Sequence, residues 1–158
     1  MTSYNKIVSN FTVTMKTYET PDGAIYVSPA GTAAAAGTVD DPLDINTALT
    51  YVKEGQTIYM RGETYNRTTP VTIPIGNDGA AAGMKTLAAY NGETPILDFG
   101  TVSAGVQLGG NYWHITGIHV TRAILTGFVV GGSNNKIVYR NLVYRNLLLM
   151  ASRIGTCF

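Results

Sequence analysis

Three basic side chains near the end of the chain are the residues best suited to bind a charged ligand. Lys136, Arg140 and Arg145 form the densest basic group in the sequence. A guanidinium presents a planar fork of donors that pairs with a carboxylate, and a lysine ammonium adds a compact positive charge. Such a group could line a groove that attracts a polymer rich in carboxylates. The alternative is a solvated outer face, because charged residues of strands ordinarily point outward.

The acidic residues are better explained by local structure than by a metal. Asp40, Asp41 and Asp44 form a local cluster of carboxylates, the ligand type that calcium prefers. They also stand where a helix would begin, with Asp41 as the N-cap, Pro42 at the first helical position and Asp44 in the first turn. We interpret the cluster as helix capping. Asp98 stands alone, so a role in a turn is favoured over metal binding.

Other combinations of residues predict no metal site and no catalytic site. His114 and His119 lie five positions apart in a region with a strand pattern, which places them on opposite faces and argues against a shared zinc ion. The sequence contains no glycine-rich phosphate loop, no nucleophile elbow and no Cys/His spacing typical of zinc sites. The residues alone therefore assign no catalytic group.

Aromatic and amide side chains gather in the same part of the chain. Tyr112 and Trp113 could form a platform that stacks on a sugar ring, or they could pack in the core or in a turn. Tyr139 and Tyr144 leave the same two alternatives open. A group of asparagines is interpreted as ladders of stacked amides at turns, which satisfy one another and the backbone. These asparagines are Asn134, Asn135, Asn141 and Asn146.

The composition favours one domain made mostly of strands. The chain has 158 residues, a formal charge of +1, 18 glycines and only 13% charged residues. This balance gives no global field that would recruit nucleic acid or an anionic membrane. There is no run of about 18 apolar residues that could span a bilayer, and residues 1–10 lack the pattern of a secretory signal. A single cysteine, Cys157, excludes an internal disulfide framework.

The order of the elements follows from patterning and turn residues. Residues 1–23 predict a lead-in strand or linker, and residues 24–158 predict the folded part. A helix is predicted over residues 41–54, where apolar residues recur at helical spacing up to Gly55. Around it the sequence predicts short strands. They cover Ala24–Ser28, Thr57–Met60, Val71–Ile75, Leu87–Tyr90, Ile96–Phe99 and the region from Gly105 onward.

A repeat of 22 residues indicates how these strands are arranged. Residues 105–115 align with residues 127–137, so that four positions are identical, including Ile115 with Ile137 and the paired glycines. A unit of this length without a helix is typical of a parallel β-solenoid, in which equivalent side chains of successive rungs stack about 4.8 Å apart. The glycines would form columns at turns and the isoleucines a column in the core. The helix would cover the exposed apolar end of the first rung.

Several segments, in this order and at these spacings, resemble the N-terminal part of the family 9 polysaccharide lyases, which are pectate-lyase-like right-handed parallel β-helices. The segments are YVSPAGT (26–32), DPLDINTAL (41–49), GQTIYMRGETY (55–65), AYNGETPILDFG (89–100) and GVQLGGNYWHITGIHV (105–120). The resemblance covers roughly residues 24–146.

The resemblance implies calcium-assisted β-elimination on polygalacturonate or pectin, in which a basic side chain removes a proton beside a uronate carboxylate held by the metal. It also implies an extracellular or cell-surface location. In the family the base and the calcium ligands come from later rungs, so no catalytic residue and no metal ligand is carried over. Lys136, Arg140 and Arg145 stay candidates for binding the acidic polysaccharide.

The end of the chain departs from the repeat. A third repeat should begin near position 149, where Leu147–Met150 replaces the expected glycine turn. We therefore expect a truncated β-helix that is inactive alone and whose open last rung self-associates or is covered by missing chain. The alternative function is a non-catalytic β-helix module that binds carbohydrate or has a structural role at a cell surface.

Overall fold

The computed structural model describes residues 16–18, 20–138 and 142–143, which form twelve short strands and one short helix. In chain order they are β1 (Ile25–Val27), α1 (Ile45–Tyr51), β2 (Thr57–Met60), β3 (Thr64–Asn66), β4 (Val71–Ile73), β5 (Lys85–Ala89), β6 (Ile96–Asp98), β7 (Ala104–Leu108), β8 (Trp113–Thr116), β9 (His119–Thr121), β10 (Thr126–Val130), β11 (Lys136–Val138) and β12 (Leu142–Val143).

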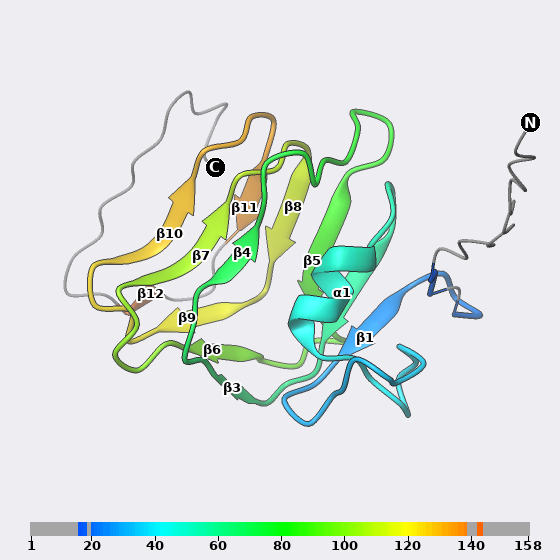
Figure 1. Ribbon diagram of the computed structural model, residues 1–158, viewed down its shortest axis with the longest axis horizontal. Coiled ribbons are helices and arrows are strands. Elements are labelled where there is room, and N and C mark those ends of the chain that lie inside the picture. Colours follow the sequence, from blue (N-terminus) through cyan, green and yellow to red (C-terminus); the bar gives the residue numbers. More distant parts are fainter. Residues whose placement is uncertain (1–15, 19, 139–141, 144–158) are drawn as a thin grey trace, which may run out of the picture.

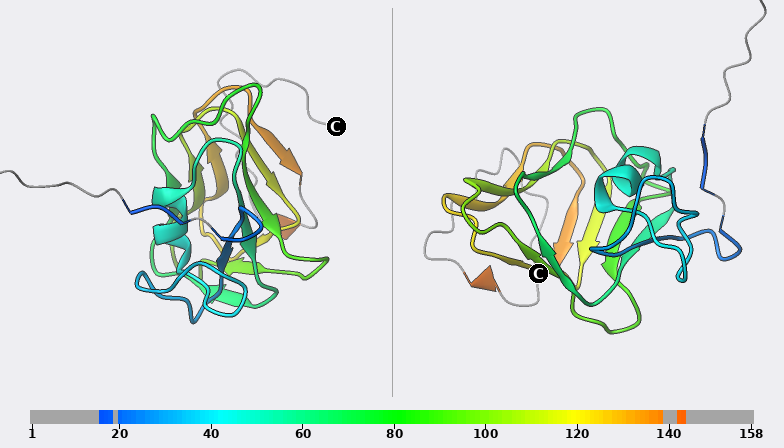
Figure 2. Two further views of the ribbon diagram at one scale, coloured as in Figure 1. Left: turned by 90° about the vertical axis from the view of Figure 1, so that its right-hand side faces the viewer. Right: turned by 60° about the horizontal axis from the view of Figure 1, so that its bottom comes forward.

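The strands form three parallel sheets around a common core (Figure 1). Sheet A has the order β1-β2-β5-β8-β11, sheet B the order β3-β6-β9-β12 and sheet C the order β4-β7-β10. All of the strand pairs that build these sheets are parallel. From β2 onward each circuit of the chain adds a strand to one sheet after another, as Figure 2 shows from two further directions. The predicted parallel β-helix is confirmed.

The strand register confirms the repeat of 22 residues. Val106 pairs with Phe128 in sheet C, and Ile115 pairs with Ile137 in sheet A, both 22 positions apart. The preceding rung is longer, because Leu87 pairs with Ile115 across 28 positions. The longer rung explains why the repeat could be recognised only in the later part of the sequence.

The glycines of the repeat stack as predicted, although not all of them lie in turns. A Cβ atom on Gly132 would overlap the carbonyl oxygen of Gly110, and one on Gly105 would overlap that of Gly127. Gly110 and Gly132 follow strands β7 and β10, as expected of a turn column. Gly105 and Gly127 instead lie inside these strands. Their small size allows close approach of backbones rather than a tight turn.

The helix exists where it was predicted, but it begins later. Its N-cap is Asp44 rather than Asp41, and an Asp44 carboxylate oxygen accepts a hydrogen bond from the Thr47 amide at 2.9 Å. Asp41 instead accepts a hydrogen bond from the Ala36 amide at 2.7 Å, within the preceding loop. The acidic residues before α1 therefore bond to two different backbone segments, the first turn of the helix and the loop before it.

The core runs through the interior of the stack and is closed at its first end by α1. Ile45, Ala48 and Leu49 of the helix are buried, and α1 contacts β1 and β4. An inward column of sheet A contains Ile25, Ile58, Leu87, Ile115 and Ile137, the first three fully buried and the last only partly buried. The helix thus covers the first rungs, as the sequence predicted.

One strand was missed by the prediction, and one predicted segment cannot be compared with the structure. Strand β3 was not predicted, and it pairs with β6 through Tyr65 and Leu97. Most of the predicted lead-in strand or linker over residues 1–23, namely residues 1–15 and 19, falls outside the described residues. Within the described part of the chain, no helix has the length and apolar character needed to cross a membrane.

Candidate functional site

The outer face of sheet A brings together the side chains with the most evident binding chemistry. Here this face means two neighbouring columns that the strand register defines. One column contains Thr57, Thr86, His114 and Lys136. The other contains Tyr26, Tyr59, Ala88, Thr116 and Val138. The face therefore carries aromatic residues at its first strands, small residues in the middle and a basic residue at its last strand.

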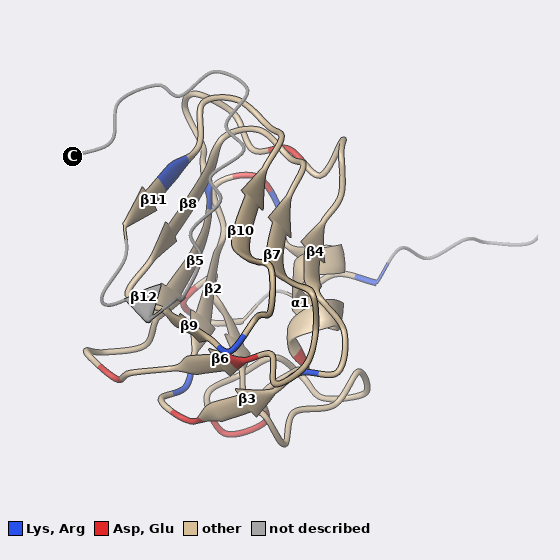
Figure 3. Cartoon of the chain, turned by 90° about the vertical axis from the view of Figure 1, so that its left-hand side faces the viewer, with Lys and Arg blue, Asp and Glu red and all other residues tan. Residues whose placement is uncertain are grey.

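Lys136 is the one member of the predicted basic group that the structure describes. It is exposed at the start of β11, where Figure 3 shows a basic residue. Its register partner on β8 is His114, whose pKa is lowered by burial and, to a smaller extent, by the positive charge of Lys136. His114 is therefore largely neutral near neutral pH. Arg140 and Arg145 lie outside the described residues.

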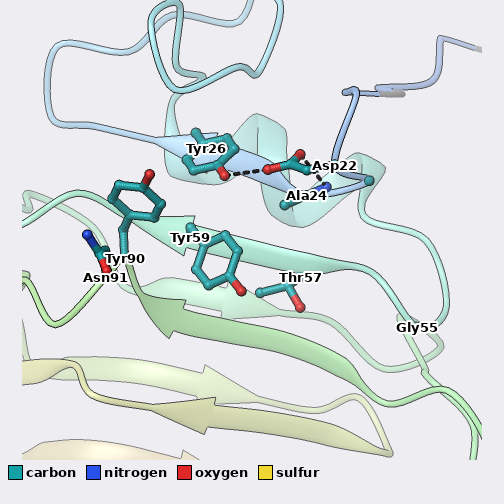
Figure 4. A pocket seen from close by; sticks show the side chains of 9 residues that line it. Asp22, Ala24, Tyr26, Gly55, Thr57, Tyr59, Tyr90 and Asn91 are labelled. Atoms are coloured by element: carbon teal, nitrogen blue, oxygen red, sulfur yellow. Dashed lines mark hydrogen bonds between the residues drawn. The ribbon is translucent and has the colours of Figure 1, made fainter.

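Three tyrosines form a cleft at the other end of the face, which we call the tyrosine cleft (Figure 4). The ring centroids of Tyr26 and Tyr59 are 5.7 Å apart, and that of Tyr90 lies 5.2 Å from Tyr26 and 5.8 Å from Tyr59. The cleft has a volume of about 530 Å³. Its lining residues are Asp22, Gly23, Ala24, Tyr26, Gly55, Thr57, Tyr59, Tyr90 and Asn91.

A carboxylate stands at the rim of this cleft. The Tyr26 hydroxyl donates a hydrogen bond of 2.5 Å to Asp22, which also accepts from the Ala24 amide at 3.1 Å. The bond from Tyr26 is the main cause that lowers the pKa of Asp22, while the same bond raises the pKa of Tyr26 to about 12. Near neutral pH the cleft therefore holds an ionised Asp22 and a neutral Tyr26.

The opposite side of the cleft is fixed by an ion pair. Arg61 lies over the Tyr90 ring, 5.5 Å from its centroid, and its Nε is 3.1 Å from a carboxylate oxygen of Glu93. Glu93 also accepts a hydrogen bond from the Gly62 amide at 2.5 Å. These contacts hold the turn that follows β5 against the turn that follows β2, and so set the position of the Tyr90 ring.

The carboxylates considered as metal ligands are engaged elsewhere. Asp98 forms two hydrogen bonds with Arg122, of 2.6 and 2.7 Å, and accepts from the Gly100 amide, which agrees with the predicted role in a turn. Asp44 caps α1. Among the described residues, no three or more His, Cys, Asp and Glu side chains gather in a way that could hold a metal ion. We therefore assign no calcium ligand among the described carboxylates.

Trp113 does not form a sugar-binding platform. Its side chain is fully buried, and its Nε1 donates a hydrogen bond of 2.7 Å to the Asn77 carbonyl oxygen. The core alternative is therefore correct for Trp113. Tyr112 precedes it in a turn with a φ of 55° and is half-buried.

The histidines and asparagines also differ in detail from the prediction. His114 and His119 lie on β8 and β9, in sheets A and B, rather than on opposite faces of one strand. Asn135 bonds to the backbone of the preceding rung, because its side chain donates to the Gly110 carbonyl at 2.9 Å and accepts from the Trp113 amide at 2.8 Å. Its bonds join successive rungs. Asn141 lies outside the described residues, as do Asn146, Tyr139 and Tyr144.

Sequence reasoning did not single out Lys85, which is buried in the structure. Lys85 is 8% exposed and occupies the inward column of sheet A next to Trp113. Its Nζ donates a hydrogen bond of 2.6 Å to the Asn77 side chain, and burial lowers its pKa. A lysine with a lowered pKa can serve as a base, but this one joins the core to a turn. Nothing in its sequence position distinguishes it from an exposed lysine.

Comparisons with known proteins agree with this architecture. Residues 25–147 match the family model described as the Pel9A-like right-handed β-helix region. The chain is 45% identical to pectate lyase L of Thermoclostridium stercorarium over 92% of its own length, and 40% identical to pectate lyase L of Paenibacillus polymyxa over 73% of its length. It spans only 12% and 27% of these two relatives.

A solved structure shows the same arrangement of strands. The crystal structure of pectate lyase Pel9A superimposes on 71% of this chain and 31% of that one, with a TM-score of 0.65 and 28% sequence identity. The predicted handedness and the predicted resemblance are both confirmed by these matches. The chain belongs to the Pel9A-like right-handed β-helix family.

Proposed function

We propose that this chain is the N-terminal part of a polysaccharide lyase that cleaves polygalacturonate-like polymers by β-elimination. The observation that carries the proposal is the family match over residues 25–147, together with relatives named pectate lyase. The chain spans a small share of those relatives, so the activity is that of a longer protein. An extracellular or cell-surface location follows from the same proposal.

The outer face of sheet A is the surface that we propose for the acidic polymer. Its middle positions, Thr86, Ala88 and Thr116, are small and let an extended polymer lie close to the sheet. Lys136 at the last strand supplies an exposed positive charge for a uronate carboxylate. We propose Arg140 and Arg145, which follow Lys136 in the sequence, as further cations for the polymer.

The elimination needs a base that removes the proton beside the uronate carboxylate, and the family resemblance expects calcium to hold that carboxylate. We assign neither a calcium ligand nor the base to any described residue. We therefore propose that this chain binds the polymer without cleaving it. The catalytic groups would belong to other rungs of the full-length protein.

Two assays test the proposal. Electrophoresis in gels that contain polygalacturonate should retard the chain, and Lys136→Ala should reduce the retardation. The control Lys16→Ala removes the same charge from the segment before β1, where Lys16 donates to the Ala33 carbonyl, and should leave the retardation largely unchanged. Absence of retardation in the unmodified chain would contradict the proposed contact with the polymer.

The second assay follows the ultraviolet absorbance of the unsaturated product with polygalacturonate and calcium, beside the same reaction with chelator. We expect no rise. A calcium-dependent rise would show that the catalytic groups lie within this chain.

The second candidate function is a non-catalytic module that binds carbohydrate, which the tyrosine cleft favours because aromatic rings suit sugar rings. Cleavage of polygalacturonate by the full-length protein would exclude it. Binding without cleavage by the full-length protein would support it.

A further inference from the structure

We propose that the tyrosine cleft binds an uncharged sugar unit, separately from the acidic polymer at the Lys136 end of the face. The cleft is built from segments far apart in the sequence: the turn before β1, strands β1 and β2, and the turn after β5. Its volume of about 530 Å³ lies within the range of roughly 300–1,000 Å³ that is typical of small-molecule sites. It is therefore large enough for a ligand of this class.

The aromatic rings provide the apolar part of such a site. Tyr26 is almost fully buried and supports the other two rings, while Tyr59 and Tyr90 are partly exposed toward the cleft. A pyranose has a flat face of C–H groups that packs on an aromatic ring, and tyrosine combines such a ring with a polar tip. Because the three rings contact one another, their orientation is set before a ligand arrives.

Polar groups at the cleft match the hydroxyls of a sugar. Among the described residues, the hydroxyls of Tyr59 and Tyr90 have no hydrogen-bond partner. Thr57 and Asn91 also line the cleft (Figure 4). Side chains of this kind both donate and accept, as sugar hydroxyls do. An apolar ligand would leave these groups unsatisfied.

The charges favour an uncharged ligand over a uronate. Asp22 is the one carboxylic acid among the lining residues, and its hydrogen bonds from Tyr26 and Ala24 keep it ionised near neutral pH. The nearby cation, Arg61, is paired with Glu93. A carboxylate on the ligand would therefore meet a net negative environment, whereas ligand hydroxyls can donate to Asp22.

Isothermal titration of the chain with three tetrasaccharides tests this inference. The probes are cellotetraose and β-1,4-linked galactotetraose, which are uncharged, and tetragalacturonate, which is charged. We expect at least one uncharged probe to bind. Tyr59→Ala should weaken that binding by about tenfold, because it removes a ring face and a hydroxyl. Tyr59→Phe keeps the ring packing and should weaken it less, by about fivefold.

Tyr51→Ala is the matched control, because Tyr51 is an exposed tyrosine on α1 whose ring contacts Tyr18 rather than the cleft. Circular dichroism establishes that each variant folds. The inference is overturned if neither uncharged probe binds, if Tyr51→Ala weakens binding as much as Tyr59→Ala, or if tetragalacturonate binding depends on Tyr59. Each of these results is independent of Lys136, so the proposal for the acidic polymer is tested separately.

Discussion

The two ends of sheet A are made of the same kind of strand but differ in how well they are covered. At the first end Ile25 and Ile58 are fully buried in the core cluster that also contains the buried residues of α1. The outer face there carries contacting tyrosines. At the last described strand Ile137 is only partly buried, Val138 is 38% exposed, and the outer face carries Lys136. Equivalent positions of one repeat can therefore differ widely in their contribution to stability and in their binding chemistry.

The largest expected effect comes from truncating an isoleucine near each end of the inward column of sheet A. Ile58→Ala should lower the free energy of unfolding by about 2–5 kcal/mol, because it leaves a cavity in a fully buried column. Ile137→Ala, at the other end of that column, should cost only about 1 kcal/mol, since less of its surface is removed from water. Urea denaturation of both variants measures the difference. Equal losses would show that the two ends are equally well covered.

The next effect concerns the stacking of the later rungs. Gly132→Ala should lower the free energy of unfolding by about 1–3 kcal/mol, because the new methyl group overlaps the Gly110 carbonyl oxygen. The control is the neighbouring Gly131→Ala, where the nearest atom to the new methyl group is the Leu108 carbonyl oxygen at 4.0 Å. Thermal melting compares the two. Equal melting temperatures for the two variants would contradict the close approach of the turns at Gly110 and Gly132.

A smaller effect is expected at the helix that covers the first end. Asp44→Ala removes the N-cap bond to the Thr47 amide and should cost about 1 kcal/mol. Asp40→Ala is the matched control, an exposed neighbour in the same acidic cluster. Chemical denaturation of the pair decides which acid caps α1. An effect confined to Asp40 would place the helix start elsewhere.

The smallest expected effect lies in the middle rungs of sheet B, at Asp98 and Arg122. The paired Arg122 is the main cause that lowers the pKa of Asp98 in the folded chain. The stabilisation of the folded chain by this pair is thus fully present above the pKa of an unfolded aspartate, about 3.9. It is lost as the pH falls through the lower pKa of Asp98 in the folded chain. Arg122→Ala should destabilise the chain near neutral pH, by less than the loss of the helix cap, and have little effect in strong acid. Denaturation over a pH series, with Asp98→Asn to complete a double-mutant cycle, measures this. A loss of stability of equal size at all pH values would show that Arg122 does not act through the charge of Asp98.

Much of the fold could be predicted because stacking leaves a periodic trace. Ile115 and Ile137 must face the same core, and Gly110 and Gly132 must both be small, so the period of 22 was visible in the sequence and the register follows it. Helix α1 was predicted from its apolar spacing. Its start was not, because three nearby acids are equally good caps; in the structure Asp44 bonds to the Thr47 amide, whereas Asp41 bonds to the Ala36 amide of the preceding loop.

The tyrosine cleft could not be predicted from the sequence. Tyr26, Tyr59 and Tyr90 come together because β1, β2 and the turn after β5 are adjacent in the first rungs. The spacings between these tyrosines are unequal and longer than the repeat, so no period joins them. For Trp113 the sequence left sugar stacking and packing in the core or in a turn both open. Its burial and its hydrogen bond to Asn77 place it in the core. Strand β3 has a single buried position, Tyr65, between the exposed Thr64 and Asn66, so it leaves no strand pattern in the sequence.

The central claim is that the outer face of sheet A receives an acidic polysaccharide at the end that carries Lys136. The most direct test is to follow the backbone amide NMR signals of the isotope-labelled chain during titration with an oligogalacturonate. We predict that the largest shifts lie at His114 and Lys136, on β8 and β11, with little change at Tyr59 and Tyr90. Shifts centred on the tyrosine cleft, or on sheet C, would contradict the account.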